Sequence, residues 1–348
     1  MTPGDRRGWA AGCDMARREN IDPLDVTLAG LCSSDRVRPE GLTLRSSVWK
    51  SHMPTSDQRT AEFESQRKRL VHLGYRMLGS IGEAEDVVQD AWLRWSEVTD
   101  CVDSPAAYLT RVVTRLCLDQ LKSARVRRET YLGTWLPEPL ISAADEVEET
   151  SDEVTFTLML AMERLSPLER AAFLLHDIFD VALAEIAVAL DRQPAAVRQL
   201  ASRARKHLRE SGPRYRIEAA EAERIADAFF FAARDGDVTR LSEILAHDVE
   251  IQADGGGKVI AFPVVIRGLH RALRLFASQS RKNGARPTLL RSALIDGLPG
   301  CISVDGNGVL QTMILGMRGA KIGTIYIVRN PEKLSHVSAA SLKGQSAR

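Results

Sequence analysis

Apolar residues recur at helical spacing between Leu183 and Leu208 and predict two short helices that meet at residues 190–193. Pro194 stands at the first position of the second helix, where its fixed φ angle and missing N–H cost nothing. One face of this helix is apolar and carries Val197, Leu200, Ala201, Ala204 and Leu208. The opposite face is polar and basic, with Arg198, Gln199, Ser202, Arg203, Arg205, Lys206 and Arg209. Such a helix suits insertion into the DNA major groove, although a solvated face on a bundle helix is the plainer interpretation.

The same periodicity predicts a three-helix unit between Phe63 and Arg128. The first helix runs from about residue 64 to 78 and ends at Gly79 and Gly82. The second begins with acidic residues, which suit the positive end of the helix dipole, and it buries Ala84, Val87, Val88, Ala91 and Trp95. The neighbouring Trp92 fits a core position and an exposed position equally well.

The third helix of this unit begins at Ser104 and Pro105, an N-cap followed by proline at the first helical position. Its buried side carries Leu109, Val112, Val113 and Leu116. Its exposed side presents Arg111, Arg115, Asp119, Lys122, Arg125, Arg127 and Arg128. This side predicts a second basic surface. The plainer interpretation is that Arg115 and Asp119 pair with each other one helical turn apart, and both can hold together.

A linker follows at residues 129–155, where Trp135-Leu136-Pro137-Glu138-Pro139 cannot be helical because each proline also restricts the residue before it. The next residues are strongly acidic. They predict a solvated tether or, as a sharper alternative, an acidic strand that occupies a nucleic-acid channel. Helices resume near Val154, and Ser166 with Glu169 predicts a capping box.

Beyond Arg214 the pattern changes to a helix that ends at residues 235–237, a short helix with Leu241 and Leu245, and runs of extended residues. The predicted strands are 249–251, 259–266, 289–294, 309–315 and 321–328, interrupted by a helix at 269–281. This order predicts an α+β domain with a curved antiparallel sheet. Asp254, His270 and Asp248 are the acid–base candidates here, but Asp254 before three glycines is more simply a turn residue.

Length, charge and cysteine content limit the class of protein to which the chain can belong. At 348 residues the chain is long enough for two or three domains, and its net charge of +1 requires any nucleic-acid affinity to come from local segregation of charge. The five cysteines form no pattern typical of zinc ligands or a disulfide framework, which favours a cytoplasmic protein without a metal. We expect no signal peptide and no transmembrane helix. Residues 1–52 predict a disordered extension, or Met53 is the true start.

The chain resembles the extracytoplasmic-function sigma factors. Residues 84–92 (AEDVVQDAW) resemble the polymerase-binding helix of that family, residues 104–119 (beginning SPAAYL) its promoter-melting helix, and residues 165–205 its domain that reads the −35 element. Three positions depart from the family pattern: Tyr108 replaces a Trp, Arg115 replaces an Asn, and Asp191 replaces the Gly of the helix-turn-helix turn. These departures bear on promoter preference.

A subgroup is indicated by residues 135–139 (WLPEP), 254–258 (DGGGK) and 330–334 (NPEKL), which resemble motifs of the SigJ-like sigma factors with a fused SnoaL-like domain. The resemblance implies two all-α sigma domains, the second with a helix-turn-helix, and a C-terminal α+β cone domain of the NTF2/SnoaL-like type. The expected segments are a disordered extension (1–60), sigma region 2 (61–130), the acidic linker (131–154), sigma region 4 (155–212), the SnoaL-like regulatory domain (216–335) and a loose tail (336–348).

The resemblance also assigns roles to residues. Contact with the polymerase is expected from Glu85, Asp86, Gln89, Asp90 and Trp92. The basic surface of the third helix is expected at the −10 element, and the basic face of residues 198–209 at the −35 element, with Arg198 and Gln199 on base edges. Regulation is expected from Trp135, Pro137, Pro139, Asp254, Gly255, Gly256, Gly257, Lys258, Asn330, Pro331 and Leu334.

The implied partners are core RNA polymerase, through its β′ coiled coil and β flap, and promoter DNA, with no membrane and no separate anti-sigma factor. No cofactor, metal or catalytic residue is implied, so we expect a protein that is not an enzyme. A small-molecule ligand inside the cone is compatible with this assignment. The alternatives are a SnoaL-like enzyme with a DNA-binding appendage and a ligand-sensing helix-turn-helix repressor, neither of which needs the acidic helix that carries Trp92.

Overall fold

The computed structural model describes residues 56–100, 102–129, 131, 133–141, 154–209, 217–281 and 285–337. The extension expected for residues 1–52, the acidic residues of the linker after Glu138, and the tail after Val337 therefore lie outside the described residues. Among the residues that are described, no helix combines the length and the apolar character needed to cross a membrane.

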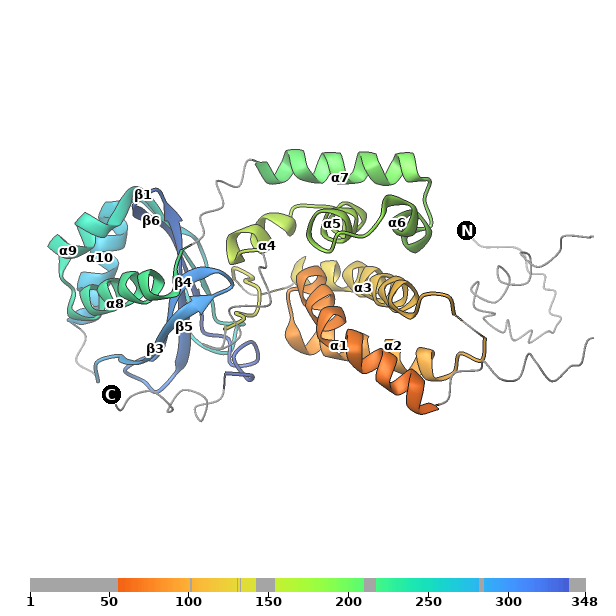
Figure 1. Ribbon diagram of the computed structural model, residues 1–348. Helices are drawn as coiled ribbons and strands as arrows, with labels where there is room; N and C mark the ends of the chain where they lie inside the picture. The colour runs from red at the N-terminus through yellow and green to blue at the C-terminus, as the bar shows by residue number, and fades with distance from the viewer. Residues whose placement is uncertain are drawn as a thin grey trace, which may run out of the picture. The chain divides into compact units, whose positions relative to one another are not determined.

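The first helical unit consists of α1 (Ser56–Leu78), α2 (Ile81–Ser96) and α3 (Pro105–Glu129) (Figure 1). Helix α1 begins at Ser56, well before the expected start near Glu64 and inside the segment 1–60 that we expected to be disordered. Contacts with α2 account for the early start, because the indole Nε1 of Trp95 donates to the carbonyl oxygen of Arg59 at 3.1 Å.

The break between α1 and α2 is shorter than predicted. Gly79 ends α1 with a φ of 76°, as expected of a helix-terminating glycine. Gly82, which we also predicted to be a breaker, lies in the first turn of α2. Ser80 supplies the N-cap, since its side chain accepts a hydrogen bond from the N–H of Glu83, and glycine so near a capped end interrupts little.

The second helical unit contains α4 (Phe156–Met162), α5 (Pro167–Phe173), the π-helical turn η2 (Leu174–Ile178), α6 (Leu183–Leu190) and α7 (Pro194–Arg209). Its local signals were predicted correctly. The capping box of Ser166 and Glu169 is formed, and α7 begins at Pro194. Asp191 ends α6 in the left-handed conformation with a φ of 52°, which Asp tolerates better than most residues.

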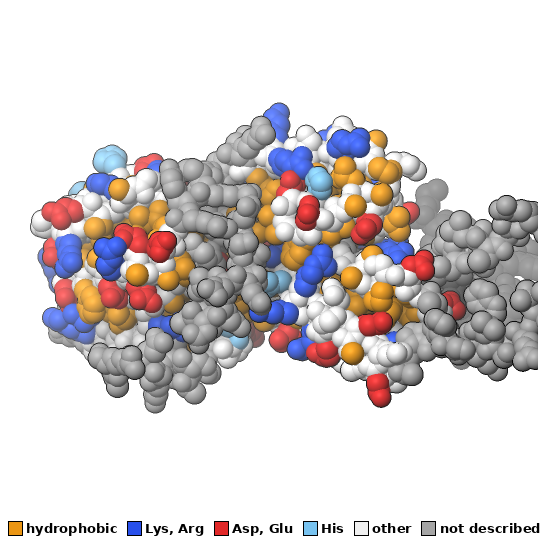
Figure 2. Space-filling view, viewed as in Figure 1, with side chains coloured by type: hydrophobic (Ala, Val, Ile, Leu, Met, Phe, Trp, Pro, Cys, Tyr) orange, Lys and Arg blue, Asp and Glu red, His pale blue; other side chains and the backbone are white. Residues whose placement is uncertain are grey.

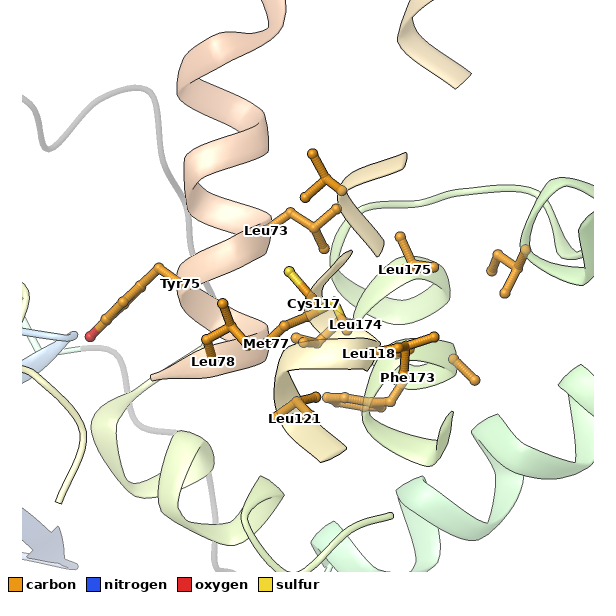
Figure 3. Packing of buried hydrophobic residues seen from close by; sticks show 14 of the residues in the cluster. Leu73, Tyr75, Met77, Leu78, Cys117, Leu118, Leu121, Phe173, Leu174 and Leu175 are labelled. Atoms are coloured by element: carbon orange, nitrogen blue, oxygen red, sulfur yellow. The ribbon is translucent and has the colours of Figure 1, made fainter. Parts of the chain in front are cut away.

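The two helical units share one hydrophobic core. Leu73 and Met77 of α1, Cys117 of α3, and Phe173 and Leu174 of the second unit belong to the same cluster of buried side chains. Figure 3 shows these side chains converging, whereas the labelled Tyr75 extends from the other side of α1. A shared core of this kind means that separating the units would expose apolar surface to water.

The C-terminal domain is α+β, as predicted (Figure 1). Its helices are α8 (Ala219–Asp235), α9 (Val238–Ile244) and α10 (Leu269–Ser280). Its strands are β1 (Leu245–Asp254), β2 (Ile266–Arg267), β3 (Thr288–Ile295), β4 (Leu298–Val304), β5 (Leu310–Arg318) and β6 (Lys321–Val328), and the described sheet has the order β2-β1-β6-β5-β4-β3.

Three expectations for this sheet were wrong. Strand β1 pairs with β6 in parallel, so the sheet is only mostly antiparallel. Residues 259–265, predicted as most of a strand, form a loop, and only Ile266 and Arg267 pair with β1. Strand β4 was missed, because Pro299 and Gly300 resemble turn residues; both are buried here in a hairpin with β3.

The sheet has a core on each face. Helices α8 and α10 cover one face, where Phe229 and Phe276 pack with sheet residues such as Leu315. On the other face, Ile314 and Tyr326 pack with Leu136 of the linker and Phe156 of α4. Successive side chains of a strand point to opposite faces of the sheet, so Ile314 and Leu315 of β5 belong to different cores. The second core therefore attaches the linker to the C-terminal domain.

Candidate nucleic-acid interface and linker junction

Helix α7 presents the predicted basic face to solvent. Val197, Ala201, Ala204 and Leu208 are buried, as the apolar pattern predicts. The exposed side chains of this helix include Arg198, Gln199, Ser202, Arg203 and Lys206. Figure 2 shows Lys and Arg side chains gathered along the position of α7. Arg205 is half-buried and its Nε donates to the carboxylate of Asp177 at 2.8 Å, and the side chain of Arg209 lies outside the described residues.

The predicted basic face of α3 is only partly exposed. Arg115 was expected to face solvent, but its Nε donates to the carbonyl oxygen of Ala189 at 3.2 Å and its Nη2 to that of Val188 at 3.3 Å. These carbonyls belong to the last turn of α6, where a cation is favoured by the helix dipole. The alternative pairing of Arg115 with Asp119 is not formed, because Arg115 donates to the carbonyl oxygens at the end of α6 and Asp119 accepts from Lys122 at 2.8 Å.

The structure describes the side chains of three of the remaining residues of this face. Arg111 is half-buried, and its guanidinium lies 5.6 Å from the centre of the Tyr108 ring. Asp119 and Lys122 are exposed. The side chains of Arg125, Arg127 and Arg128 lie outside the described residues.

Helix α2 carries an exposed acidic surface. Glu85, Asp86, Gln89 and Asp90 all face solvent, as predicted. Trp92 is half-buried against the ring of Phe63, with 5.0 Å between the ring centres. Leu93 is 52% exposed, and helical spacing places it on the same face as Asp86 and Asp90; sequence reasoning missed it because it selected only the acidic residues, Gln89 and Trp92 on this helix. The acidic surface therefore has an apolar residue available beside its carboxylates.

The linker motif (residues 135–139) is held by one buried carboxylate. Asp254 is 1% exposed, and its Oδ2 accepts a hydrogen bond from the backbone N–H of Leu136 at 2.9 Å. Its Oδ1 accepts from the hydroxyl of Tyr131 at 2.6 Å and from the N–H of Gly256 at 2.9 Å. The simple turn role that we expected for Asp254 is incomplete, because it also anchors a segment 118 positions earlier in the chain.

Lys333 completes this cluster from the C-terminal segment. Its Nζ donates to Oδ2 of Asp254 at 2.7 Å and also to the carbonyl oxygen of Leu136. The ammonium lies 4.3 Å from the centre of the Trp135 ring, within the range of a cation–π interaction. Burial raises the pKa of the Tyr131 hydroxyl, and the hydrogen bond to Asp254 raises it further, so this hydroxyl remains a donor.

Asn330 joins the same cluster because Gly256 has no side chain. The amide Nδ2 of Asn330 donates to the hydroxyl of Tyr131 at 3.0 Å. A Cβ atom on Gly256, whose φ is 62°, would lie 2.4 Å from that Nδ2. At the surface, Lys258 forms an ion pair with Glu332. The motifs at 135–139, 254–258 and 330–334 therefore meet in space, with Lys333 and Tyr131 as members that sequence reasoning did not select.

The linker motif also contacts the turn between α1 and α2. The carboxylate of Glu138 accepts hydrogen bonds from the hydroxyl of Ser80 and from the N–H of Ile81, each at 2.7 Å. A carboxylate at this position suits the positive end of α2. Trp135 packs against Gly79, where a Cβ atom would lie 2.7 Å from the indole ring. One short segment therefore contacts both the first helical unit and the C-terminal domain.

A second buried carboxylate, Asp296 in the turn between β3 and β4, connects the C-terminal domain to α1 and to the linker. Its Oδ1 accepts from Nη1 of Arg76 at 3.0 Å, and its Oδ2 accepts from the N–H of Leu140 at 2.9 Å. The single O–H of Tyr75 is shared between two acceptors, the carbonyl oxygen of Glu138 at 2.7 Å and the carboxylate of Asp296 at 3.1 Å. Burial raises the pKa of Asp296, although the Arg76 charge and these hydrogen bonds oppose that shift.

Sequence reasoning missed Asp296, Arg76 and Tyr75. Asp296 and Gly297 give a turn signal, but no spacing in the sequence links this turn to α1, 220 positions away. We call the two carboxylates with their partners the linker junction: Asp254 with Leu136 and Lys333, and Asp296 with Arg76 and Leu140.

The acid–base candidates of the C-terminal domain have other roles or surroundings. Asp254 is part of the linker junction, Asp248 forms an ion pair with Arg318, and His270 is exposed on α10. Within the described part of the chain, no group of three or more His, Cys, Asp or Glu residues is placed to hold a metal ion.

Comparisons with known proteins identify the family of the chain. Residues 63–127 match the family model "Sigma-70 region 2", and residues 155–208 match "Sigma-70, region 4". The chain is 35% identical to the "ECF RNA polymerase sigma factor SigJ" of Mycobacterium tuberculosis, over 79% of this chain and 93% of the relative. It is 32% identical to a "Probable ECF RNA polymerase sigma factor SigI" of the same organism, over 82% of this chain and 98% of the relative.

A solved structure is similar as well. The crystal structure of the SigJ sigma factor from Mycobacterium tuberculosis aligns with a TM-score of 0.63 and 32% identity, and covers 79% of this chain and 98% of the SigJ chain. The alignment with the curated SigJ sequence spans 294 residues, which is more than the two helical units contain. The chain therefore belongs to the family of extracytoplasmic-function RNA polymerase sigma factors.

Proposed function

We propose that this sigma factor uses surfaces of the three helices α2, α3 and α7 for its partners and that its C-terminal domain controls their arrangement through the linker junction. The chain is an alternative sigma factor that directs core RNA polymerase to promoters and initiates transcription. Its partners are accordingly the polymerase and promoter DNA. In this proposal, individual residues have separate roles toward these partners, and the protein acts in the cytoplasm and catalyses no reaction.

At the −35 element, Arg198 and Gln199 contact base edges, with Ser202 and Arg203 beside them. Their exposure on α7 supports this role. Lys206, Arg205 and Arg209 hold phosphates, and Arg205 does so at the expense of its ion pair with Asp177. A bidentate Arg–guanine contact is worth about 1–3 kcal/mol of discrimination between bases.

At the −10 element, Arg111, Lys122, Arg125, Arg127 and Arg128 follow the phosphates of the strand that is opened, with Asp119 orienting Lys122. Arg115 joins them only after it leaves the carbonyl oxygens of Val188 and Ala189. The arrangement with Arg115 on α6 is therefore a closed state, and binding to DNA requires the two helical units to move apart.

Polymerase binding uses the exposed acidic surface of α2. Glu85, Asp86, Gln89 and Asp90 pair with basic residues of the β′ coiled coil, and the second helical unit reaches the β flap. Leu93 supplies an apolar anchor, because it is more exposed than Trp92, which packs on Phe63. Trp92 then contributes through the exposed part of its ring.

Regulation rests on one observation: Asp254 and Lys333 of the C-terminal domain hold the backbone of Leu136 in the linker. The linker joins the helices that contact the two promoter elements, so fixing it limits how far these helices separate. The C-terminal domain thereby acts in place of a separate anti-sigma protein. A small-molecule ligand in the cone is a candidate signal for releasing the linker.

The test is transcription by reconstituted polymerase. Core polymerase with the full-length chain is assayed on the promoter upstream of the chain's own gene, for the wild type and for Asp254→Asn. The proposal expects transcription to change by at least severalfold, since the variant weakens the hold on Leu136. Asp248→Asn is the matched control, because it lies on the same strand but is exposed and paired with Arg318. Equal transcription from all three proteins would contradict the regulatory role.

A further inference from the structure

The C-terminal domain contains a cavity of about 260 Å³ on the side of the sheet that α8 and α10 cover. Part of its lining is apolar and comes from Phe230 of α8, Phe276 of α10 and Met313 of β5, whereas polar side chains make up the rest. All three side chains are almost completely buried, so these walls are part of the packed domain. An apolar cavity of about 150 Å³ accommodates one benzene molecule, so this cavity has room for one or two fused rings.

The polar part of the lining is positively charged. Arg234, Arg281 and Arg286 line the cavity, and its described lining includes no Asp or Glu. Asp235, beside the cavity, accepts hydrogen bonds from Arg234 at 2.8 Å and from Arg286 at 3.3 Å. One carboxylate thus orients two guanidinium groups and leaves a net positive charge among these four side chains.

Neutral hydrogen-bonding groups complete the lining. Gln279 and Ser280 lie at the end of α10, and Gln311 lies on β5, where its amide also donates to Ser303 at 3.3 Å. Small-molecule sites combine apolar walls with a few polar groups that orient the ligand. Guanidinium groups suit a carboxylate in particular, because their planar fork donates two parallel hydrogen bonds.

We infer that this cavity binds a small organic anion that consists of an aromatic ring system and a carboxylate. The ring lies among Phe230, Phe276 and Met313, where aromatic and thioether groups pack favourably on a ring. The carboxylate faces Arg286 and Arg281 at the rim. The inference names a ligand class for the C-terminal domain and rests on the proposed regulatory function only for its consequence in transcription.

The experiment measures binding to the purified full-length chain without polymerase, so it does not depend on the sigma-factor function. Isothermal titration calorimetry compares three probes with the same ring: indole-3-acetate, the neutral indole-3-acetamide and the cationic tryptamine. Phenylacetate and 1-naphthaleneacetate vary the ring size at constant charge. We expect at least one anion to bind, and indole-3-acetate to bind about tenfold more tightly than its amide, as charged hydrogen bonds do.

Two variants test whether the ligand binds in this cavity. Arg286→Gln removes one rim charge and is expected to weaken binding of the anions about tenfold while leaving the amide unchanged. Ala233→Phe fills the cavity from α8 and is expected to abolish binding of all probes. The matched control is Arg267→Gln, since Arg267 is also exposed and paired with one carboxylate, Glu250, but does not line the cavity.

Several results would overturn the inference. These are no binding of any of the three anions, equal affinities for indole-3-acetate and its amide, or equal effects of Arg286→Gln and Arg267→Gln. Thermal unfolding of each variant shows that a loss of binding is not a loss of fold. If the anion binds as expected but transcription is unaffected by Asp254→Asn, the ligand site stands and the proposed regulatory function fails.

Discussion

The guanidinium of Arg76 and the carboxylate of Asp296 form an ion pair with 3.0 Å between Nη1 and Oδ1, and both side chains are almost completely buried. The pair joins α1 to the turn between β3 and β4. A buried ion pair adds little to the stability of the fold compared with apolar residues of similar size. Removing one partner, however, leaves a buried charge that is no longer compensated. The pair therefore specifies which surfaces of α1 and the C-terminal domain can meet.

Asp296→Ala is expected to lower the free energy of unfolding by about 3–5 kcal/mol, because it removes the carboxylate that compensates Arg76. Urea denaturation followed by circular dichroism measures the change. The double variant Arg76→Met/Asp296→Ala is expected to recover part of the loss, since no buried charge remains. The exposed ion pair of Asp248 and Arg318 provides the control, where Asp248→Ala costs at most about 1 kcal/mol. A double variant as unstable as the sum of the single variants would contradict the coupling.

Lys333→Met is expected to loosen the linker motif. The variant keeps most of the apolar stem but removes the ammonium from Asp254 and from the carbonyl of Leu136. Hydrogen exchange should then be faster at the amide of Leu136, whose N–H bonds to Asp254. Lys321→Met, at an exposed position of β6, is the control. Unchanged protection of Leu136 in the Lys333 variant would show that the linker is held by other contacts.

Substitutions on α7 should separate base reading from phosphate binding. Arg198→Ala is expected to lose about 1–3 kcal/mol of discrimination at one base pair of the −35 element. Lys206→Ala is expected to weaken binding to all sequences alike. It is also expected to reduce the slope of log affinity against log salt concentration by about one. Affinities of the holoenzyme for a set of singly substituted promoters, measured at several salt concentrations, test both. Loss of base discrimination in the Lys206 variant would reverse the assignment.

Leu93→Ala is expected to weaken binding to core polymerase by about 1–2 kcal/mol, as truncation of an apolar anchor in an interface does. Fluorescence anisotropy of the labelled chain titrated with core polymerase measures the affinity. Val238→Ala provides a control, because Val238 is also an exposed apolar residue but lies on α9 of the C-terminal domain. If the two variants bind equally well, Leu93 is not an anchor.

The capping box of α5 should make this helix sensitive to acid. Partial burial raises the pKa of Glu169, but the hydrogen bonds from the hydroxyl and N–H of Ser166 lower it more, so the net shift is downward. Because the folded-state pKa lies below the unfolded value of about 4.3, Glu169 stabilises the fold above that pH and loses this contribution as the pH falls through its depressed pKa.

Ser166→Ala is expected to cost about 1 kcal/mol of stability at pH 7. Thermal unfolding of the wild type and the variant between pH 3 and pH 7 measures the difference. The difference should shrink toward the acid end, and a constant difference over this range would show that the hydrogen bonds of Ser166 do not depend on the charge of Glu169.

The sequence by itself determined the local structure and the family. Helical periodicity, the caps at Ser104 and Ser166 and the proline at 194 depend on neighbouring residues, so they could be predicted for the helical units. The exposed faces of α2 and α7 also followed from periodicity. Strand β4 did not, because its Pro299 and Gly300 are accommodated by the pairing with β3 and not by their own preferences.

Only the tertiary structure decided how the parts contact one another. Arg115 has the sequence pattern of an exposed DNA-binding residue, yet it donates to carbonyl oxygens at the end of α6. Asp254 has the pattern of a turn residue, yet it is buried and holds Leu136. No pattern in the sequence predicts that Asp296 and Arg76 are in contact. Hydrogen bonds and ion pairs act over a few ångströms in space, whereas sequence patterns report on neighbours along the chain, so contacts between distant segments depend on the folded arrangement.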